Sequence, residues 1–174
     1  MPHIDRSNFD VLIGPTNLNQ KDIDGINELL KQLSNSFKEL DKQKIDLILG
    51  QPNFRLIIFK CYNTGEMIGI ATLYFEKTLM SPDGIGKIED VVIGKNYRGL
   101  GLGEEIMNYI ISLAKGINLS RIDLTSNPNN PNRKIAIKLY EKLGFEKKDG
   151  YFSLNMFSPN INNRPNWLIK KLRY

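Results

Sequence analysis

Cysteine, histidine and long apolar runs are scarce in this chain, and each scarcity excludes a class of protein. Cys61 is the sole cysteine among 174 residues, so no intramolecular disulfide is possible and a reducing, cytoplasmic location is expected. His3 is the sole histidine, which argues against Ser-His-Asp catalysis and histidine-rich metal sites. No run approaches the ~18 apolar residues of a membrane span, and the N-terminus has no apolar leader, so neither membrane insertion nor secretion is expected.

Size and composition are those of one globular domain. Hydrophobic residues make up 41% of the chain and charged residues 25%, close to the globular average. The net charge of +5 is unevenly placed, because residues 159–174 carry four basic residues and no acid. We therefore predict one domain over residues 1–158 followed by a basic extension over 159–174. A nucleic-acid partner is not expected, since no basic stripe interleaved with aromatic residues is present.

Periodicity and turn residues predict a mixed α/β fold. Apolar residues at helical spacing predict helices, and β-branched or aromatic runs between turn residues predict strands. We expect helices over 23–33 (capped by Asp22), 43–49, 102–114 and 132–143, strands over 54–62, 67–75, 88–93 and 121–125, a turn at 81–84, and a closing hairpin within 144–157. This order predicts a single mixed sheet with helices on its faces.

A glycine-rich turn between a strand and a helix is the most informative stretch. Val91 to Ile93 end the predicted strand, and Gly99, Gly101 and Gly103 precede or open the next helix. Such a turn directs free backbone N–H groups, with the helix dipole behind them, at whatever lies in front. Glycine permits positive φ and close approach of a ligand to the backbone. The sequence therefore predicts an anion site here.

Two common glycine motifs are excluded at this turn. Gly94 to Gly99 has the frame of a P-loop, but Leu100 follows where the motif requires lysine. The Rossmann pattern fails because Glu104 or Ile106 stands where the third glycine belongs, depending on the frame. The anion is therefore not expected to belong to a P-loop nucleotide or a Rossmann-bound dinucleotide.

Two motifs together resemble the GNAT N-acetyltransferases. Arg98 to Gly103 reads R-x-x-G-x-G, which is similar to the pyrophosphate-binding motif of that family. Thirty residues on, Ala136 to Phe145 reads A-x-x-x-Y-E-K-x-G-F, which resembles a second hallmark at the family's spacing. Lys87 to Val92 is similar to the family's fourth strand. The resemblance implies a central, mostly antiparallel sheet flanked by helices and splayed where the cofactor binds.

The same resemblance implies acetyl-CoA as cosubstrate, with no metal. The backbone of Val91, Val92 and Ile93 is expected to hydrogen-bond the pantetheine arm, so this strand should separate from its neighbour. The pyrophosphate is expected to lie among Arg98 and the backbone N–H groups of Gly99, Leu100, Gly101, Leu102 and Gly103. Many members carry asparagine three residues before the alanine of the second motif, where this chain has Arg133.

The resemblance also implies catalytic roles. Tyr140 is expected to be the general acid, because loss of the acetyl group leaves a thiolate and a phenol has a pKa of ~10, close enough to a thiol's ~8.5 to protonate it. An amine needs a base, and Glu89 is favoured over Asp90, its neighbour in the strand; adjacent strand residues face opposite sides. Ordered water, which Ser126 could hold, is the alternative to a carboxylate.

The leading hypothesis is direct acetyl transfer from acetyl-CoA to a primary amine in a ternary complex. A non-catalytic CoA-binding module would keep the glycine turn and need neither Tyr140 nor a base. A basic surface-binding protein would rest on residues 159–174 alone. Covalent carriage by Cys61 is disfavoured by its place on an early strand. The acceptor, a small molecule or a protein amine, and the oligomeric state are not determined by the sequence.

Overall fold

A computed structural model describes residues 9–13, 17–34, 36–127 and 133–156 of the chain, so the predicted basic extension lies outside the described part. The helices are α1 (Gln20–Lys31), α2 (Lys42–Leu49), α3 (Leu102–Gly116) and α4 (Lys134–Lys142), with a 3₁₀ turn η2 (Lys95–Tyr97). The strands are β1 (Phe9–Ile13), β2 (Phe54–Cys61), β3 (Met67–Thr78), β4 (Ser81–Ile93), β5 (Arg121–Leu124), β6 (Glu146–Lys147) and β7 (Phe152–Asn155).

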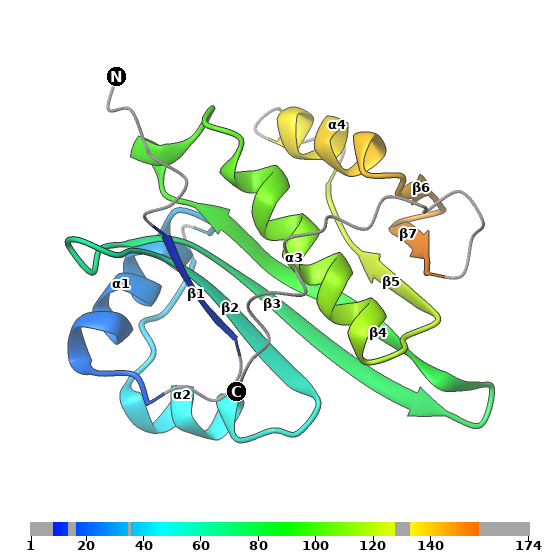
Figure 1. Cartoon of the computed structure of the whole chain (residues 1–174), viewed down its shortest axis with the longest axis horizontal. Coiled ribbons are helices and arrows are strands. Elements are labelled where there is room, and N and C mark those ends of the chain that lie inside the picture. The colour runs from blue at the N-terminus through cyan, green and yellow to red at the C-terminus, as the bar shows by residue number, and fades with distance from the viewer. Residues whose placement is uncertain (1–8, 14–16, 35, 128–132, 157–174) are drawn as a thin grey trace.

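The strands form one seven-stranded sheet in the order β1-β2-β3-β4-β5-β7-β6. Every neighbouring pair is antiparallel except β4 and β5, which run parallel because α3 carries the chain back between them. Figure 1 shows α3 and α4 lying apart from α1 and α2, with the long β3–β4 hairpin extending beyond the rest of the sheet. This confirms the predicted mixed, mostly antiparallel sheet with flanking helices.

Helices cover both faces of the sheet, because the central strands are apolar on both sides. In β2, Ile57 and Phe59 pack into a cluster with α3, whereas Leu56 and Ile58 pack into a second cluster with α1 and α2. All four side chains are buried. A strand buried on both faces reads as a continuous apolar run rather than an alternating one, which is how residues 56–59 read.

The start of α1 differs from the predicted cap. Asn19, not Asp22, is the N-cap: its side chain accepts from the Asp22 N–H (3.0 Å), and the Asp22 carboxylate accepts from the Asn19 N–H (3.2 Å). This reciprocal pair is a capping box. Asp22, only 5% exposed, also forms an ion pair with Lys60 of β2. The first turn of α1 is therefore fixed to the sheet.

The turn predicted at residues 81–84 is also corrected. Ser81 to Gly84 belong to β4, and the chain reverses at Leu79 and Met80 instead. The pairing register shifts between Glu76 and Thr78, and Gly84 takes a φ of +91°. The turn-forming residues are thus absorbed by a β-bulge inside the hairpin, which lets β4 continue past them.

The first strand was not predicted from the sequence. β1 pairs antiparallel with β2, from Phe9 opposite Cys61 to Ile13 opposite Ile57, and forms one edge of the sheet. Among the described residues, no helix is both long and apolar enough to cross a membrane.

Candidate active site

The site is created by a difference in length between two neighbouring strands. β4 spans 13 residues and β5 only four, and their parallel ladder ends where Ile88 pairs with Leu124. Beyond Ile88, β3 is the only strand with which β4 pairs among the described residues. The predicted separation of this strand from its neighbour is therefore confirmed.

The backbone of β4 beyond Ile88 has hydrogen-bonding groups directed at the gap. The Gly94 N–H donates to the Ile68 carbonyl of β3 at 2.8 Å. Because residues alternate along an antiparallel ladder, the backbone groups of Val91 and Ile93 are directed away from β3, and those of Val92 toward it. The Val92 side chain packs in the α1–α2 cluster, whereas Val91 and Ile93 pack against the α3 cluster.

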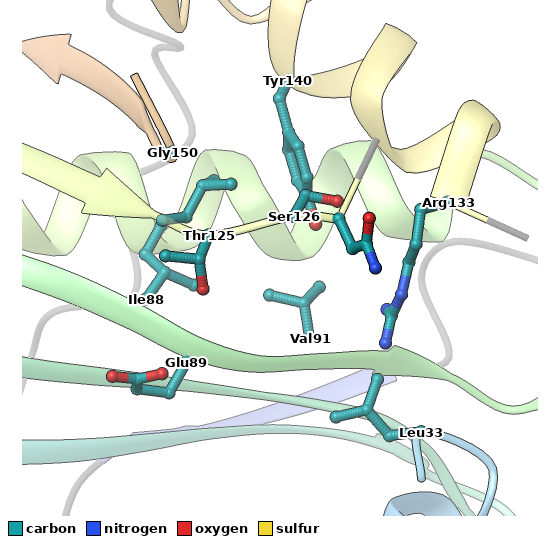
Figure 2. A pocket seen from close by; sticks show the side chains of 11 residues that line it. Leu33, Ile88, Glu89, Val91, Thr125, Ser126, Arg133, Tyr140 and Gly150 are labelled. Carbon is teal, nitrogen blue, oxygen red and sulfur yellow. The ribbon is translucent and has the colours of Figure 1, made fainter. Parts of the chain in front are cut away.

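A cavity of about 490 Å³ occupies this gap. It brings Tyr140 and Glu89, the two predicted catalytic residues, together with Val91 of the predicted cofactor strand (Figure 2). The full lining is Leu33, Ile88, Glu89, Val91, Leu124, Thr125, Ser126, Asn127, Arg133, Tyr140 and Gly150. Leu33 and Gly150, which lie far from the other lining residues in the sequence, complete the wall and were not among the predicted catalytic or cofactor residues. Thr125 and Asn127 follow the end of β5. Their position directly after a strand would have been enough to predict them as site residues from the sequence.

Tyr140 enters the cavity from α4 and is held by aromatic neighbours. Its ring lies 6.1 Å from the ring of Phe145 and 6.0 Å from that of Phe152, centroid to centroid, and the residue is only 7% exposed. Burial raises the pKa of the Tyr140 phenol, partly opposed by the nearby Arg133 charge. The phenol is therefore fully protonated at neutral pH, as a proton donor must be.

Glu89 and Asp90 lie in an irregular part of β4. The register with β3 shifts between Ala71 and Leu73, and Ile88 and Val91 both belong to the α3 cluster although they are three residues apart. In a regular strand, residues three apart face opposite sides. The simple alternation assumed for Glu89 and Asp90 from the sequence therefore does not hold, because a bulge lies between their neighbours.

The two carboxylates have different surroundings. Glu89 lines the cavity, has a side chain that is 45% exposed, and forms an ion pair with Lys87 (Nζ–Oε1, 2.6 Å). Asp90 accepts a hydrogen bond from Thr72 Oγ1 at 3.1 Å, and burial raises its pKa. Figure 2 shows Glu89 across the β4 ribbon from Tyr140. A base and an acid at these positions would approach a reacting group from different sides.

The glycine turn has the geometry of an anion site. Gly99 and Gly101 take positive φ values, +79° and +82°. Within the described part of the chain, no acceptor bonds the backbone N–H groups from Gly99 to Gly103, which precede or open the 15-residue helix α3. Successive free N–H groups at a helix N-terminus bind anions. None of these residues lines the cavity, and the chain connects the two through the end of β4 and η2.

Arg98 holds the start of the turn. Its Nε donates to the Ile93 carbonyl at 2.9 Å, and its Nη2 donates to Gln32 Oε1 at 3.3 Å. The guanidinium thus has a structural task that was not foreseen, and it occupies a carbonyl that the pantetheine arm was expected to use. Gln32 was missed as well, because 66 residues separate the two partners.

Comparisons with known proteins agree with this geometry. The family described as Acetyltransferase (GNAT) matches residues 24–145. A glucosamine 6-phosphate N-acetyltransferase of Dictyostelium discoideum is 29% identical over 139 residues, 78% of this chain and 85% of that protein. One from Trypanosoma brucei brucei is 29% identical over 94 residues, 53% of this chain and 60% of that protein.

Solved structures share the fold. An acetyltransferase of Trypanosoma brucei superposes with a TM-score of 0.67 at 23% identity, covering 81% of this chain and 94% of that one. The glucosamine-6-phosphate N-acetyltransferase of Arabidopsis thaliana superposes with a TM-score of 0.65 at 21% identity, covering 80% and 92%. This chain belongs to the GNAT family of acetyltransferases, whose members use acetyl-CoA.

Replacing one glycine tests the turn as an anion site. Gly103→Pro deletes one free N–H in the first helical turn, where proline is tolerated. Gly103→Ala keeps that N–H, and its Cβ would meet Leu139 at an ordinary 3.5 Å. By calorimetry, we expect the proline variant to bind CoA about 10- to 100-fold more weakly, the usual effect of losing a hydrogen bond to a charged group.

The alanine variant is the matched control and should bind CoA as the wild type does. Circular dichroism and melting temperature establish that both variants are folded. Wild-type affinity in the proline variant would show that this N–H does not contact CoA. Gly101 is unsuitable for this test, because at a φ of +82° any side chain strains the backbone.

Proposed function

We propose that this protein transfers the acetyl group of acetyl-CoA to a primary amine by direct attack within a ternary complex. The observation that carries the proposal is the protonated, buried Tyr140 in a cavity between β4 and β5, next to a turn of free N–H groups. Together they provide an anion site, an open strand edge and a proton donor. A module that only binds CoA does not need the proton donor.

The cofactor would lie along β4. Its pyrophosphate would accept hydrogen bonds from the N–H groups of Gly99 to Gly103, with Arg98 adding positive charge nearby. Its pantetheine arm, which carries two amides, would bond the outer edge of β4 at Val91 and at the Ile93 N–H as an added strand does, because the Ile93 carbonyl already accepts from Arg98. The thioester would then reach the cavity beside Tyr140. Arg133, which lines the same cavity, is available to the arm or to the acceptor.

An ammonium loses two protons in becoming an amide, and the departing thiolate gains one. Glu89 accepts the first proton from the ammonium, directly or through a water near Ser126, and the free amine then attacks the thioester carbon. As the C–S bond breaks, its electron pair goes to sulfur, and Tyr140 donates its proton to give free CoA thiol. The second proton of the nitrogen passes through water to the Tyr140 phenolate, and Glu89 releases its proton to solvent.

The first acceptors to test are amino sugars and their phosphates. Two relatives are named glucosamine 6-phosphate N-acetyltransferases, each at 29% identity. A second cavity of about 290 Å³ shares Leu124 and Thr125 with the first and is lined by charged and aromatic side chains, among them Lys87, Arg121 and Tyr151. Such a surface suits a polar acceptor that is larger than a simple amine.

Acetyl-CoA should stabilise the protein. An amine that accepts the acetyl group should convert acetyl-CoA into free CoA thiol. Ligand binding to the folded state alone raises the melting temperature, so millimolar acetyl-CoA should raise it while NADH and ATP do far less. A panel of amines, including glucosamine 6-phosphate, glucosamine and a lysine peptide, is then screened for thiol release. Stabilisation without turnover of any amine would favour the non-catalytic module, and no stabilisation would refute CoA binding.

Tyr140→Phe tests the general acid. The change keeps the ring against Phe145 and Phe152 but removes the proton donor, so the melting temperature and CoA affinity should change little. The rate should fall by about 10²–10⁴-fold in both kcat and kcat/KM, because the interaction belongs to the transition state. Tyr109→Phe, at a half-buried tyrosine that lies outside the cavity, is the control. Activity within about threefold of wild type would make Tyr140 a packing residue only.

Glu89→Gln and Asp90→Asn separate the two candidate bases. Loss of the base should lower kcat/KM by about 10²–10⁴-fold, and we expect this for Glu89→Gln alone. Lys87→Met removes the ion pair but keeps the carboxylate, so kcat should be retained and any change should appear in the KM for the acceptor, because Lys87 also lines the second cavity. If Asp90 were the base, Asp90→Asn would be inactive instead. Because the Asp90 pKa is raised, the acidic limb of the kcat/KM profile would then lie above the usual aspartate range.

A further inference from the structure

Gln32 joins two parts of the site that are far apart in the sequence. It is the C-cap of α1, and its side-chain oxygen accepts from the Lys95 N–H at 2.9 Å and from Arg98 Nη2 at 3.3 Å. Its side-chain nitrogen donates to the Glu28 carbonyl at 3.3 Å within α1. One amide therefore connects the last turn of α1 to η2 and to the first residue of the glycine turn.

The residue after Gln32 belongs to the cavity wall. Leu33 lines the cavity, and its N–H donates to the Leu30 carbonyl at 2.9 Å, which continues the last turn of α1. The far end of the α1–α2 connection is fixed too, because the Asn27 side chain bonds both the N–H and the carbonyl of Leu40, each at 2.9 Å. The segment that presents Leu33 is thus held to α1 at one end and to the cofactor turn, through Gln32, at the other.

We propose that Gln32 is a positioning residue that couples the glycine turn to the Leu33 wall of the transfer cavity. The inference rests on the proposed function in one respect, that CoA binds at Arg98 to Gly103. A bound pyrophosphate fixes the turn, and with it the two donors that face Gln32. The last turn of α1 and Leu33 are then held where the acceptor must pass.

The role proposed for residue 32 requires a side chain as long as that of glutamine, with a hydrogen-bond acceptor oxygen at its end. Glutamate supplies one, and its charge suits the Arg98 guanidinium. Methionine matches glutamine in length but offers no comparable acceptor. Because the two bonds are solvent-exposed, their loss should weaken CoA binding by only about two- to fivefold, the lower range for single hydrogen bonds.

Hydrogen exchange with CoA as the probe tests the coupling without an acceptor. At saturating CoA, backbone amides of fragments that span the end of α1 and the segment up to Leu40 should exchange more slowly in the wild type than without CoA. In Gln32→Met this slowing should be lost although CoA is bound, as calorimetry will show. Gln32→Glu should restore it, which a purely structural role of the amide nitrogen would not explain.

Gln20→Met is the matched control. Gln20 lies at the other end of α1, where its side chain bonds Asp24 at 2.8 Å on the surface, and its change should leave the CoA effect intact. Slowing that persists in Gln32→Met, or that is equally lost in Gln20→Met, would overturn the coupling. If CoA binds the wild type but does not slow the exchange, the coupling is wrong and the proposed function stands. If CoA does not bind, the proposed function is wrong as well.

Discussion

The site depends on one mismatch in the sheet, the early end of β5 beside the longer β4. A parallel pair consumes the facing N–H and carbonyl groups of both strands for as long as it lasts. Here it lasts four residues, from Ile85–Arg121 to Ile88–Leu124. Of the next five residues of β4, Val91, Val92 and Ile93 stay paired with β3, Glu89 and Asp90 lie at the register shift, and none of the five pairs with β5. Cavity, open edge and glycine turn follow in sequence along that single strand.

The mismatch is stable because both faces of β4 are still covered. Val92 is 4% exposed among residues of α1 and α2, whereas Val91 and Ile93 pack against the cluster built on α3. Burial of these side chains offsets the ladder bonds that β4 does not make with β5. The bulge at Glu89 and Asp90 adds to this arrangement, since it allows Ile88 and Val91 to share one face. Ile88, Glu89 and Val91 therefore all line the cavity.

The glycine turn has backbone N–H groups without an acceptor in the described part of the chain, whereas its neighbours are fixed by packing and hydrogen bonds. Gly99 and Gly101 take positive φ, and within the described residues no atom lies within 4 Å of the place that a Cβ on Gly99 would take. Rigidity comes from elsewhere: Leu102 is 2% exposed in the core, and Arg98 bonds the Ile93 carbonyl behind the turn. Geometry for a ligand and stability for the loop are thus supplied by different residues.

The sequence by itself determined the local elements and the family. Periodicity predicted α3 and α4, the β2–β3 hairpin was recognisable from its turn, and the two motifs indicated a GNAT acetyltransferase before any coordinates. These features are local, because helix periodicity, turn residues and glycine spacing act within about ten residues. The same local logic misplaced the cap of α1 and the β3–β4 turn. In both cases a hydrogen bond or a strand register several residues away determined the structure, and the nearest capping or turn residue in the sequence did not.

Tertiary structure decided everything that joins distant segments. The strand β1 is defined by its pairing with β2, some fifty residues later, and its own five residues carry too weak a pattern. Leu33 in the cavity wall, Gln32 beside Arg98 and the Asp22–Lys60 pair all unite residues separated by dozens of positions. Such contacts depend on which faces the helices bury and on where β5 stops. Which chemical groups are present is thus a property of the sequence, and the packing of the sheet decided which of them meet.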